Sequence, residues 1–357
     1  MNVELCHNLE SLVSLQPEWD TLLQRSATNV IFLTWAWQRA WWNAFGSGKD
    51  LRVLALRDGN GHLEAIVSLF VQETPPAPSS PLPDLNGERP LDTPAGTRQR
   101  TVYLVGGTEV SDYLDVIAPA VLTPEVCATF LDVLASMNDW HVLDLRPLPA
   151  GSPTVSAVVE SCRARGWDVH QTTEDVCPVF ALPHTWAEYL SQRLNKKQRH
   201  ELRRKIHRAE QRTAVEWHWV DNPDTLSEGL DIFFRLHKAS DPGKDVFMDD
   251  QMLGFFSEVA QVALEKGWLR LSLLRFDGHP VASYLCFDYG NDRLVYNSGF
   301  DPSAYRDLSP GIVLLGYLIK DAIQSGCRSF DFLRGDEHYK YSLGAKDTEV
   351  LRLVVRR

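Results

Sequence analysis

The feature that most restricts the fold of this chain is an internal repeat. Residues 51–70 read LRVLALRDGNGHLEAIVSLF and residues 269–287 read LRLSLLRFDGHPVASYLCF. In both segments, alternating apolar residues flank a short turn that contains Asp and Gly, which is the pattern of two antiparallel strands joined tightly. Later in each half, HVLDLRP at 141–147 resembles RSFDFLRG at 328–335, and each follows a helix with apolar periodicity. Two matches in the same order predict a duplicated chain.

The two matches are offset by different distances, and one segment of the first half explains the difference. Residues 73–100 contain seven prolines. Proline fixes the backbone and removes an N–H donor, so a segment this rich in proline is not regular structure. We therefore expect an inserted surface loop at 73–100.

The repeat predicts an α/β (α+β) protein of two domains, at 1–180 and 181–357. Each domain should hold a mixed, mainly antiparallel sheet flanked by helices, and 357 residues suit two domains of roughly 150 residues. Apolar periodicity and capping residues predict helices in both halves. The expected helices are at 17–25, 34–45, 124–137 and 153–165, then at 186–212, 224–238, 249–266 and 309–325.

Composition limits the class of protein. The N-terminus has neither the basic nor the apolar region of a signal peptide, and no apolar run is long enough for a membrane span. The six cysteines are scattered without a CxxC pair, which predicts buried thiols, a reducing cytoplasm and no metal site. The net charge of −11 argues against DNA binding.

Several segments resemble one family. They are FLTWAWQRAWWNAFG, SDYLD, LNKKQRHELRR, YRDLSPGIVLL and DFLRGDEHYK. Together these segments, which extend over nearly the whole chain, are similar to the CelD-like branch of the GNAT acetyltransferases, which is related to the Fem-type peptidoglycan aminoacyltransferases. The resemblance implies tandem GNAT-like domains, an acyl donor such as acetyl-CoA, and an amine acceptor often linked to envelope or exopolysaccharide metabolism.

The first candidate site is the start of the helix expected at 309–325. Ser309 suits an N-cap, Pro310 suits the first turn, and Gly311 allows close approach to the backbone. Free N–H groups and the helix dipole make such an end an anion site. The resemblance places the CoA pyrophosphate in this loop, with Tyr305, Arg306, Ser309 and Gly311 as candidates. A well-capped helix without a ligand is the alternative.

The second candidate site is the segment at 331–340, which follows a strand of the predicted sheet. Ligands of α/β sheets bind beyond the carboxyl ends of strands. Acyl transfer to an amine needs a base, a donor for the developing oxyanion and an acid for the leaving group. The candidates are Asp331, Asp336 and Glu337 as the base, Tyr339 as the acid, and Arg334 and Lys340 as charge-neutralising residues. The alternative is a turn with surface charges in which Asp331 caps the backbone.

The third candidate site is a basic segment. Between Arg193 and Arg212 there are nine Lys/Arg and two Glu, a charge of +7 within a chain of net charge −11. The candidate binding residues are Lys196, Lys197, Arg199 and Arg203. A solvated helix face explains the pattern equally well, and an electropositive rim for a phosphorylated acceptor, CoA or a tRNA acceptor stem is the functional interpretation.

Two further patterns are assigned to structure rather than to chemistry. The tryptophans at 35, 37, 41 and 42 lie on a short amphipathic segment and are expected in the core rather than on a sugar-binding surface. HKASD at 237–241 has the spacing of an HxxxD acyltransfer motif. It lacks the flanking second His, and Pro242 stands where that motif has glycine, so we do not assign it.

The resulting prediction is an N-acyltransferase that moves an acyl group, expected to be acetyl, from acyl-CoA to an amine of a sugar or small metabolite. The second domain would catalyse, and the degenerate first domain would shape the acceptor site. A Fem-like transferase using aminoacyl-tRNA is the alternative, favoured by the basic segment and disfavoured by the overall acidity. A non-catalytic subunit of a polysaccharide-synthesis assembly is a third interpretation.

Overall fold

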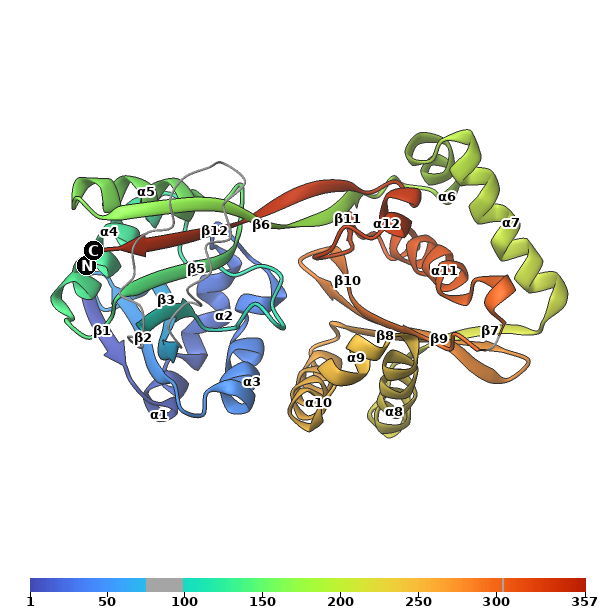
Figure 1. The fold of residues 1–357 in the computed structure, drawn as a ribbon, viewed down its shortest axis with the longest axis horizontal. Helices are drawn as coiled ribbons and strands as arrows, with labels where there is room; N and C mark the ends of the chain where they lie inside the picture. The colour runs from blue at the N-terminus through green and yellow to red at the C-terminus, as the bar shows by residue number, and fades with distance from the viewer. Residues whose placement is uncertain (75–98, 304) are drawn as a thin grey trace. The chain divides into compact units, whose positions relative to one another are not determined.

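The computed structural model describes residues 1–74, 99–303 and 305–357, so nearly all of the loop predicted at 73–100 lies outside the described residues. Over these ranges the protein is a mixed α/β fold (Figure 1). The strands are β1 (Asn2–Cys6), β2 (Asp50–Arg57), β3 (Leu63–Thr74), β4 (Gln99–Leu104), β5 (Val142–Pro149), β6 (Asp168–Ala181), β7 (Val215–Val220), β8 (Leu269–Phe276), β9 (His279–Tyr289), β10 (Asp292–Phe300), β11 (Ser329–Asp331) and β12 (Lys346–Arg356). The helices are α1 (Leu9–Val13), α2 (Gln16–Gln24), α3 (Trp35–Phe45), α4 (Thr123–Ser136), α5 (Pro153–Ala164), α6 (Trp186–Glu188), α7 (Lys196–Arg212), α8 (Pro223–Ser240), α9 (Pro242–Phe247), α10 (Asp250–Glu265), α11 (Pro310–Gln324) and α12 (His338–Ser342).

The chain forms two compact units. The first contains Met1–Trp35, Gly46–Glu174 and Leu351–Arg357, and the second contains Ala36–Phe45 and Asp175–Val350. The sheet order is β1-β2-β3-β4-β5-β12-β6 in the first unit and β7-β8-β9-β10-β11-β6-β12 in the second. The predicted mixed, mainly antiparallel sheet flanked by helices is confirmed.

Strand pairing repeats between the two halves. The predicted hairpins are the antiparallel pairs β2–β3 and β8–β9. After each hairpin comes one parallel pair, β4 with β5 and β10 with β11. The order of pairing is therefore the same in the two halves, as the sequence repeat predicts.

The strands β6 and β12 are the part of the sheet that the repeat did not predict. β6 follows α5 in the first half of the chain, yet it pairs with β11 of the second half. β12 ends the second half and lies between β5 and β6 in the sheet. Each half therefore contributes its last strand beside the fifth strand of the other half. The last seven residues consequently belong to the first unit.

One expected helix is wrong. The sequence predicted a continuous helical region at 186–212, but the chain forms α6, a π-helical turn and then α7. Leu194 interrupts it with an extended backbone and a buried side chain. Asn195 then starts α7 through a reciprocal capping box with Gln198, so local side-chain bonds favour a new helix start. No helix in the described ranges combines the length and apolarity needed to cross a membrane.

Helices cover both faces of the sheet in the second unit. Figure 1 shows α8, α9 and α10 on one side of β8 and β9, and α7 and α11 on the other. α3 belongs to this unit because Trp37 packs edge-on against Phe255, Phe287 and Tyr296, with ring centroids 5.3–5.9 Å apart. Trp37 is buried, which confirms the prediction of a core role for this tryptophan.

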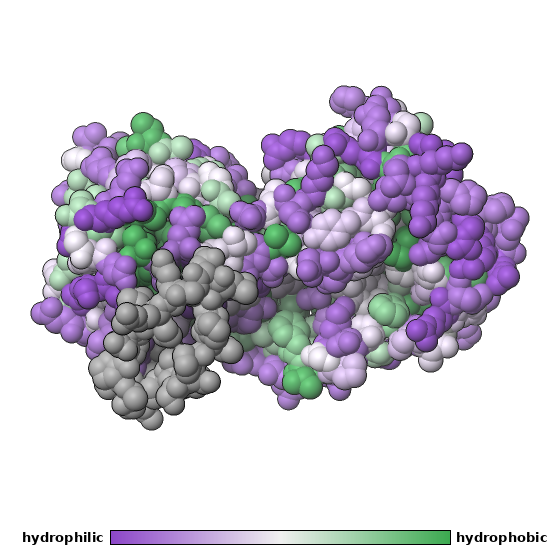
Figure 2. Space-filling model, turned by 45° about the horizontal axis from the view of Figure 1, so that its top comes forward, coloured by the Kyte–Doolittle hydropathy of each residue, from purple (hydrophilic) through white to green (hydrophobic). Residues whose placement is uncertain are grey.

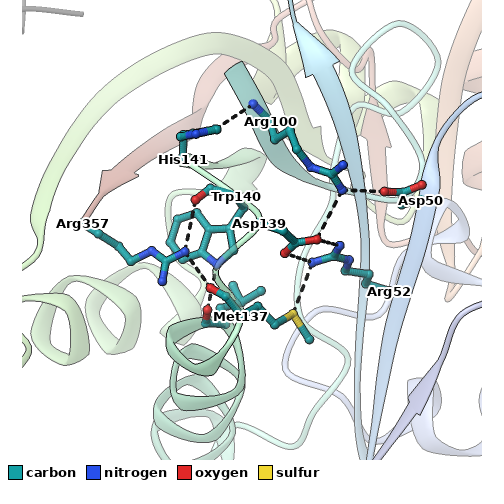
Figure 3. A network of polar contacts seen from close by, with 9 residues as sticks. Asp50, Arg52, Arg100, Met137, Asp139, Trp140, His141 and Arg357 are labelled. Carbon is teal, nitrogen blue, oxygen red and sulfur yellow. Dashed lines mark hydrogen bonds and ion pairs between the residues drawn. The ribbon is translucent and has the colours of Figure 1, made fainter. Parts of the chain in front are cut away.

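The end of the chain is held inside the first unit (Figure 3). The guanidinium of Arg357 lies 4.2 Å from the centre of the Trp140 ring and donates to Met137 O at 2.7 Å and Trp140 O at 3.1 Å. Nearby, Arg52 forms a paired ion contact with Asp139. The contacts of Arg357 hold the end of β12 beside the segment that follows α4.

Candidate active site

The site is built where the parallel pair β10–β11 ends. Asp292, Arg293 and Leu294 pair with the three residues of β11, and the register of β10 shifts between Val295 and Asn297. β10 continues to Phe300, whereas β11 stops at Asp331. The carboxyl end of β11 is thus followed by a loop, and the loop, the first turn of α11 and the end of α8 surround a cavity of about 550 Å³. We name it the β10 cavity.

The β10 cavity brings together two of the three predicted sites. From the loop before α11 it takes Arg306, Ser309 and Gly311, and from the segment after β11 it takes Glu337 and Tyr339. These two segments are more than twenty residues apart in the sequence. The fold therefore brings residues of the first two candidate sites to the same cavity.

The first turn of α11 presents backbone rather than a capping side chain. Ser309 is the N-cap residue of α11, as the sequence predicted, but its backbone is left-handed, with φ of 54°, and its hydroxyl makes no capping bond. Pro310 has no N–H, and the N–H groups of Ile312 and Val313 both bond to Ser309 O. The N–H of Gly311 donates to no acceptor among the described residues.

The position of Gly311 is open. A Cβ placed there would meet only Tyr284 Oη, at 3.7 Å, and the backbone φ does not demand glycine. A ligand atom can therefore occupy the space that a side chain would take. Arg306 is exposed and lines the same cavity, and a guanidinium is a group that can bind a phosphate.

Tyr305 lies elsewhere. Its hydroxyl donates to Asp277 Oδ2 at 3.0 Å, and its ring packs edge-on against Phe276 with centroids 5.4 Å apart. Tyr305 is not among the residues lining either cavity described here. It supports the loop that carries Arg306.

Lys340 stabilises the loop between β11 and α12. Its ammonium is buried and donates to Arg334 O at 2.7 Å, Gly335 O at 2.9 Å and Leu333 O at 3.3 Å. It also lies 2.8 Å from Glu337 Oε2. These contacts explain how the loop holds Leu333 at a φ of 56°, a conformation that side chains rarely adopt.

Asp331 has a comparable structural contact. One carboxylate oxygen accepts from Leu333 N at 2.8 Å, and the residue is 8% exposed. Asp336 is exposed and Arg334 is half-buried. Neither these three residues nor Lys340 are among the residues lining the two cavities. Of the six predicted catalytic residues, Glu337 and Tyr339 line the β10 cavity.

Two phenols face the β10 cavity, from Tyr284 in β9 and from Tyr339 in α12. Burial is the main cause that raises the pKa of both hydroxyls above the usual value of 10, and the nearby Glu337 raises both further. Both phenols are therefore protonated and neutral around pH 7 and are able to donate a hydrogen bond or a proton. Tyr284 was not predicted, because a tyrosine in a buried strand gives no sequence signal for a site.

The segment after α8 supplies further residues that the sequence did not predict. Ser240 and Lys244 line the β10 cavity, and Lys244 Nζ donates to Ser298 O at 2.8 Å. His237 is 1% exposed and its Nδ1 donates to the same carbonyl at 3.0 Å. Burial, and then the charge of Lys244, lower the pKa of His237 to about 4. The Asp-Pro helix start at 241–242 was the available sequence signal for this turn.

A second cavity, also of about 550 Å³, lies beside α7. This α7 cavity is lined by Lys197 and Lys205 on α7 and by His338 on α12, and it shares Ile312 and Tyr339 with the β10 cavity. Figure 2 shows hydrophilic side chains over the part of the second unit where α7 lies. The two cavities thus border the same phenol.

The predicted basic residues divide between different roles. Lys197 is exposed and lines the α7 cavity, while Lys196 and Arg203 are exposed on α7 outside it. Arg199 is half-buried and donates to Leu190 O at 3.1 Å, so it connects α7 to the π-helical turn that precedes it. Among the residues that the structure describes, no His, Cys, Asp and Glu side chains gather as a metal-binding group.

Comparison with known proteins gives a domain family for part of the chain and a shared fold for nearly all of it. Residues 196–341 match the family model described as an acetyltransferase (GNAT) domain. The search of curated proteins found no match. FemX shares the fold with a TM-score of 0.64 at 12% identity, over 98% of this chain and 96% of that one.

Two other solved structures have the same fold at similar identity. A protein from Bacteroides thetaiotaomicron VPI-5482 has a TM-score of 0.57 at 11% identity and covers 100% of both chains. L-PGS from Bacillus licheniformis has a TM-score of 0.54 at 11% identity, over 96% of this chain and 91% of that one. Residues 196–341 therefore match a GNAT-type acetyltransferase domain, within a chain that shares its fold with FemX.

Proposed function

We propose that the second unit is an N-acyltransferase that takes an acyl group, acetyl in the simplest case, from acyl-CoA and transfers it to the amine of a sugar or small metabolite. The observation that carries this proposal is the β10 cavity, which is lined both by the first turn of α11 and by Glu337 and Tyr339. The GNAT domain at residues 196–341 supports acyl-CoA as the donor.

The donor would bind through its phosphates. The N–H of Gly311 and the guanidinium of Arg306 offer hydrogen bonds and charge to the pyrophosphate. Lys197 and Lys205 in the α7 cavity supply further positive charge for the rest of the nucleotide. The thioester would then lie where both cavities border Tyr339.

The reaction needs two proton transfers. The amine nitrogen attacks the thioester carbonyl, a C–N bond forms, and the C–S bond breaks. Glu337, whose side chain is 57% exposed at the cavity, would accept the proton from the amine directly or through water. Tyr339, which burial keeps protonated, would donate a proton to the leaving thiolate.

Calorimetric titration of the full chain with acetyl-CoA tests the donor. We expect saturable heat, and in Arg306→Ala an affinity lower by roughly tenfold, the loss of one charge-assisted contact. Lys320→Ala, on the exposed side of α11, is the matched control and should bind as the parent does. No saturable heat at millimolar acetyl-CoA would refute acyl-CoA as the donor and leave aminoacyl-tRNA transfer and the non-catalytic subunit as the alternatives.

Transfer from an aminoacyl-tRNA is the second candidate function. It is favoured by the exposed cations of α7, including Lys196 and Arg203, and by the fold shared with FemX. Binding of tRNA to these cations should weaken steeply with salt. Transfer of a labelled amino acid from aminoacyl-tRNA, with no transfer from acetyl-CoA, would replace the first candidate by this one.

The remaining parts of the proposal concern biological setting. Membership of the CelD-like branch and a role in envelope or exopolysaccharide metabolism rest on the resemblance of segments such as 331–340. The cytoplasm is the proposed location because acyl-CoA is made there. We propose no metal and no DNA partner.

A further inference from the structure

Strand β10 and helix α8 approach each other unusually closely at Gly299. A Cβ at this position would lie 2.2 Å from His237 N and 2.4 Å from Leu236 C, so only glycine permits the contact. Backbone on both sides forms the contact, and backbone atoms do not move aside easily. The preceding residue, Ser298, lines the β10 cavity and is held in a fixed place.

The carbonyl of Ser298 accepts two hydrogen bonds. His237 Nδ1 donates at 3.0 Å and Lys244 Nζ donates at 2.8 Å. Because a carbonyl only accepts, the proton of this imidazole is on Nδ1. Lys244 belongs to the short helix α9, and its hydrogen bond to Ser298 O connects this helix to β10 at the wall of the cavity.

Among the described residues, no carboxylate forms an ion pair with Lys244. Glu337 and Asp241 are the carboxylates whose charges act on it, and neither forms an ion pair with it within 4.0 Å. Glu337 is instead paired with Lys340 at 2.8 Å, and Asp241 Oδ1 accepts from Gly243 N at 2.7 Å. Burial lowers the pKa of Lys244, as expected for an ammonium that lacks a partner.

Lys340 and Lys244 differ in the number of acceptors around their ammonium groups. Lys340 has three carbonyl acceptors and a carboxylate, which is a complete set for an ammonium. Lys244 has one carbonyl acceptor in the hydrogen bonds found among the described residues. A half-buried charge at a cavity wall is costly unless an opposite charge joins it, and the place left for that charge is the cavity itself.

We propose that Lys244 binds an anionic group of the acceptor, so that the acceptor is an amine that also carries a carboxylate or a phosphate. Lys244 and Glu337 line the same cavity. A molecule with both an amine and an anionic group complements this pair. The inference rests on the proposed function, because it names the acceptor class for the same site.

The test measures release of free thiol from acetyl-CoA by the full chain with matched pairs of amines. Each proteinogenic amino acid is compared with the amine that lacks its carboxylate, and glucosamine 6-phosphate is compared with glucosamine. We expect turnover of at least one amine that carries an anionic group (an acidic amine) and a much higher KM for its match that lacks this group. The two arms distinguish a carboxylate from a phosphate.

The variants Lys244→Met and Lys244→Arg assign the effect to this residue. Loss of one charge-assisted contact should raise the KM for the acidic amine roughly 10- to 100-fold in Lys244→Met, while Lys244→Arg should restore part of the preference. Lys320→Met, exposed on α11, is the control. The affinity for acetyl-CoA, measured by calorimetry, should stay the same in all variants.

Three results of the turnover assay would overturn the inference. They are turnover confined to amines without an anionic group, no turnover with the whole acidic panel by a protein that binds acetyl-CoA, and an unchanged KM ratio in Lys244→Met. A lower acetyl-CoA affinity in Lys244→Met would overturn it too, because Lys244 would then belong to the donor site. Absence of acetyl-CoA binding in the parent protein is a separate result, which refutes the donor.

Discussion

Lys340 and Glu337 form an ion pair, with 2.8 Å between Nζ and Oε2, one turn of α12 apart. The ammonium is buried and also binds three carbonyls of the loop after β11, whereas the carboxylate is 57% exposed at the β10 cavity. The pair therefore connects the fold of the loop to the position of the proposed base. Lys340 positions the site without facing the cavity.

Replacing Lys340 should affect stability and activity together. Lys340→Met leaves three loop carbonyls without their donor, so we expect the free energy of unfolding to fall by roughly 2–4 kcal/mol. Urea unfolding followed by circular dichroism measures this change. Lys346→Met, at an exposed position of β12, is the control and should lie within about 0.5 kcal/mol of the parent. Equal stability of the two variants would contradict the structural role of Lys340.

Substitution of Gly311 should weaken acetyl-CoA binding without lowering the stability of the protein. A Cβ at Gly311 fits the free protein, so Gly311→Ala should leave stability unchanged or raise it by about 0.4–1 kcal/mol. The same methyl group would occupy the place of the proposed phosphate and should weaken acetyl-CoA binding by roughly tenfold or more. Gly254→Ala, in an open position of α10, should stabilise without changing binding. Calorimetry and thermal unfolding give the two readouts, and unchanged affinity in Gly311→Ala would place the phosphates elsewhere.

Tyr339 should control the rate rather than the affinity. Tyr339→Phe removes the proposed proton donor, so kcat should fall roughly 100-fold while acetyl-CoA affinity changes little. Tyr341→Phe, whose hydroxyl bonds to exposed Asp347 at 2.8 Å, is the control and should keep its rate.

The pH profile checks the same residue. Because burial raises the pKa of Tyr339, the phenol stays protonated at pH values up to the usual tyrosine pKa near 10. The parent enzyme should therefore show no loss of rate from this group between neutral pH and about pH 10. If Tyr339→Phe kept the kcat of the parent enzyme, Tyr339 would not be the proton donor.

His237 should make the protein sensitive to acid. Its pKa in the folded protein is about 4, below the value near 6.5 in an unfolded chain. Above about pH 6.5 the imidazole is neutral in both states and contributes no pH dependence. As the pH falls from about 6.5 to about 4, the unfolded state binds the proton first, so stability decreases, by up to about 3 kcal/mol.

The variant His237→Gln tests this contribution through the slope of stability against pH rather than through stability itself. The slope between about pH 6.5 and 4 should become smaller than in the parent. His218→Gln, at an exposed position of β7, should keep the parent slope. Urea unfolding at a series of pH values measures it, and an equal slope in His237→Gln would show that the imidazole titrates normally.

Much of the local structure followed from the sequence. The hairpins β2–β3 and β8–β9 were predicted because alternating apolar residues and an Asp-Gly turn specify neighbouring strands. α11 was predicted to begin near Ser309 because Pro310 favours a first turn. The hydroxyl of Ser309 does not cap the helix, however, since its left-handed backbone arises from the loop rather than from the residue type.

The site itself was predicted in part. Arg306 and Gly311 were named because a helix start binds anions and the resemblance places the CoA pyrophosphate there, and both line the β10 cavity. Glu337 and Tyr339, which line it too, were named because acyl transfer needs groups of their chemistry beyond the end of a strand. Lys340 and Asp331 were named for the same reason. Their side chains bind the backbone instead, which residue type alone does not reveal.

The sequence by itself determined the duplication, the class of fold and the places where polar groups follow apolar strands, because these features depend on neighbours along the chain. The tertiary structure alone decided that β6 and β12 each pair beside the other half's fifth strand. It alone placed Tyr284 and Lys244 in the same cavity as Glu337. The physical reason is that strand pairing and the burial of a charge depend on contacts between residues that are distant in the sequence. The free energy of such a contact leaves no pattern among neighbouring residues from which it could be predicted.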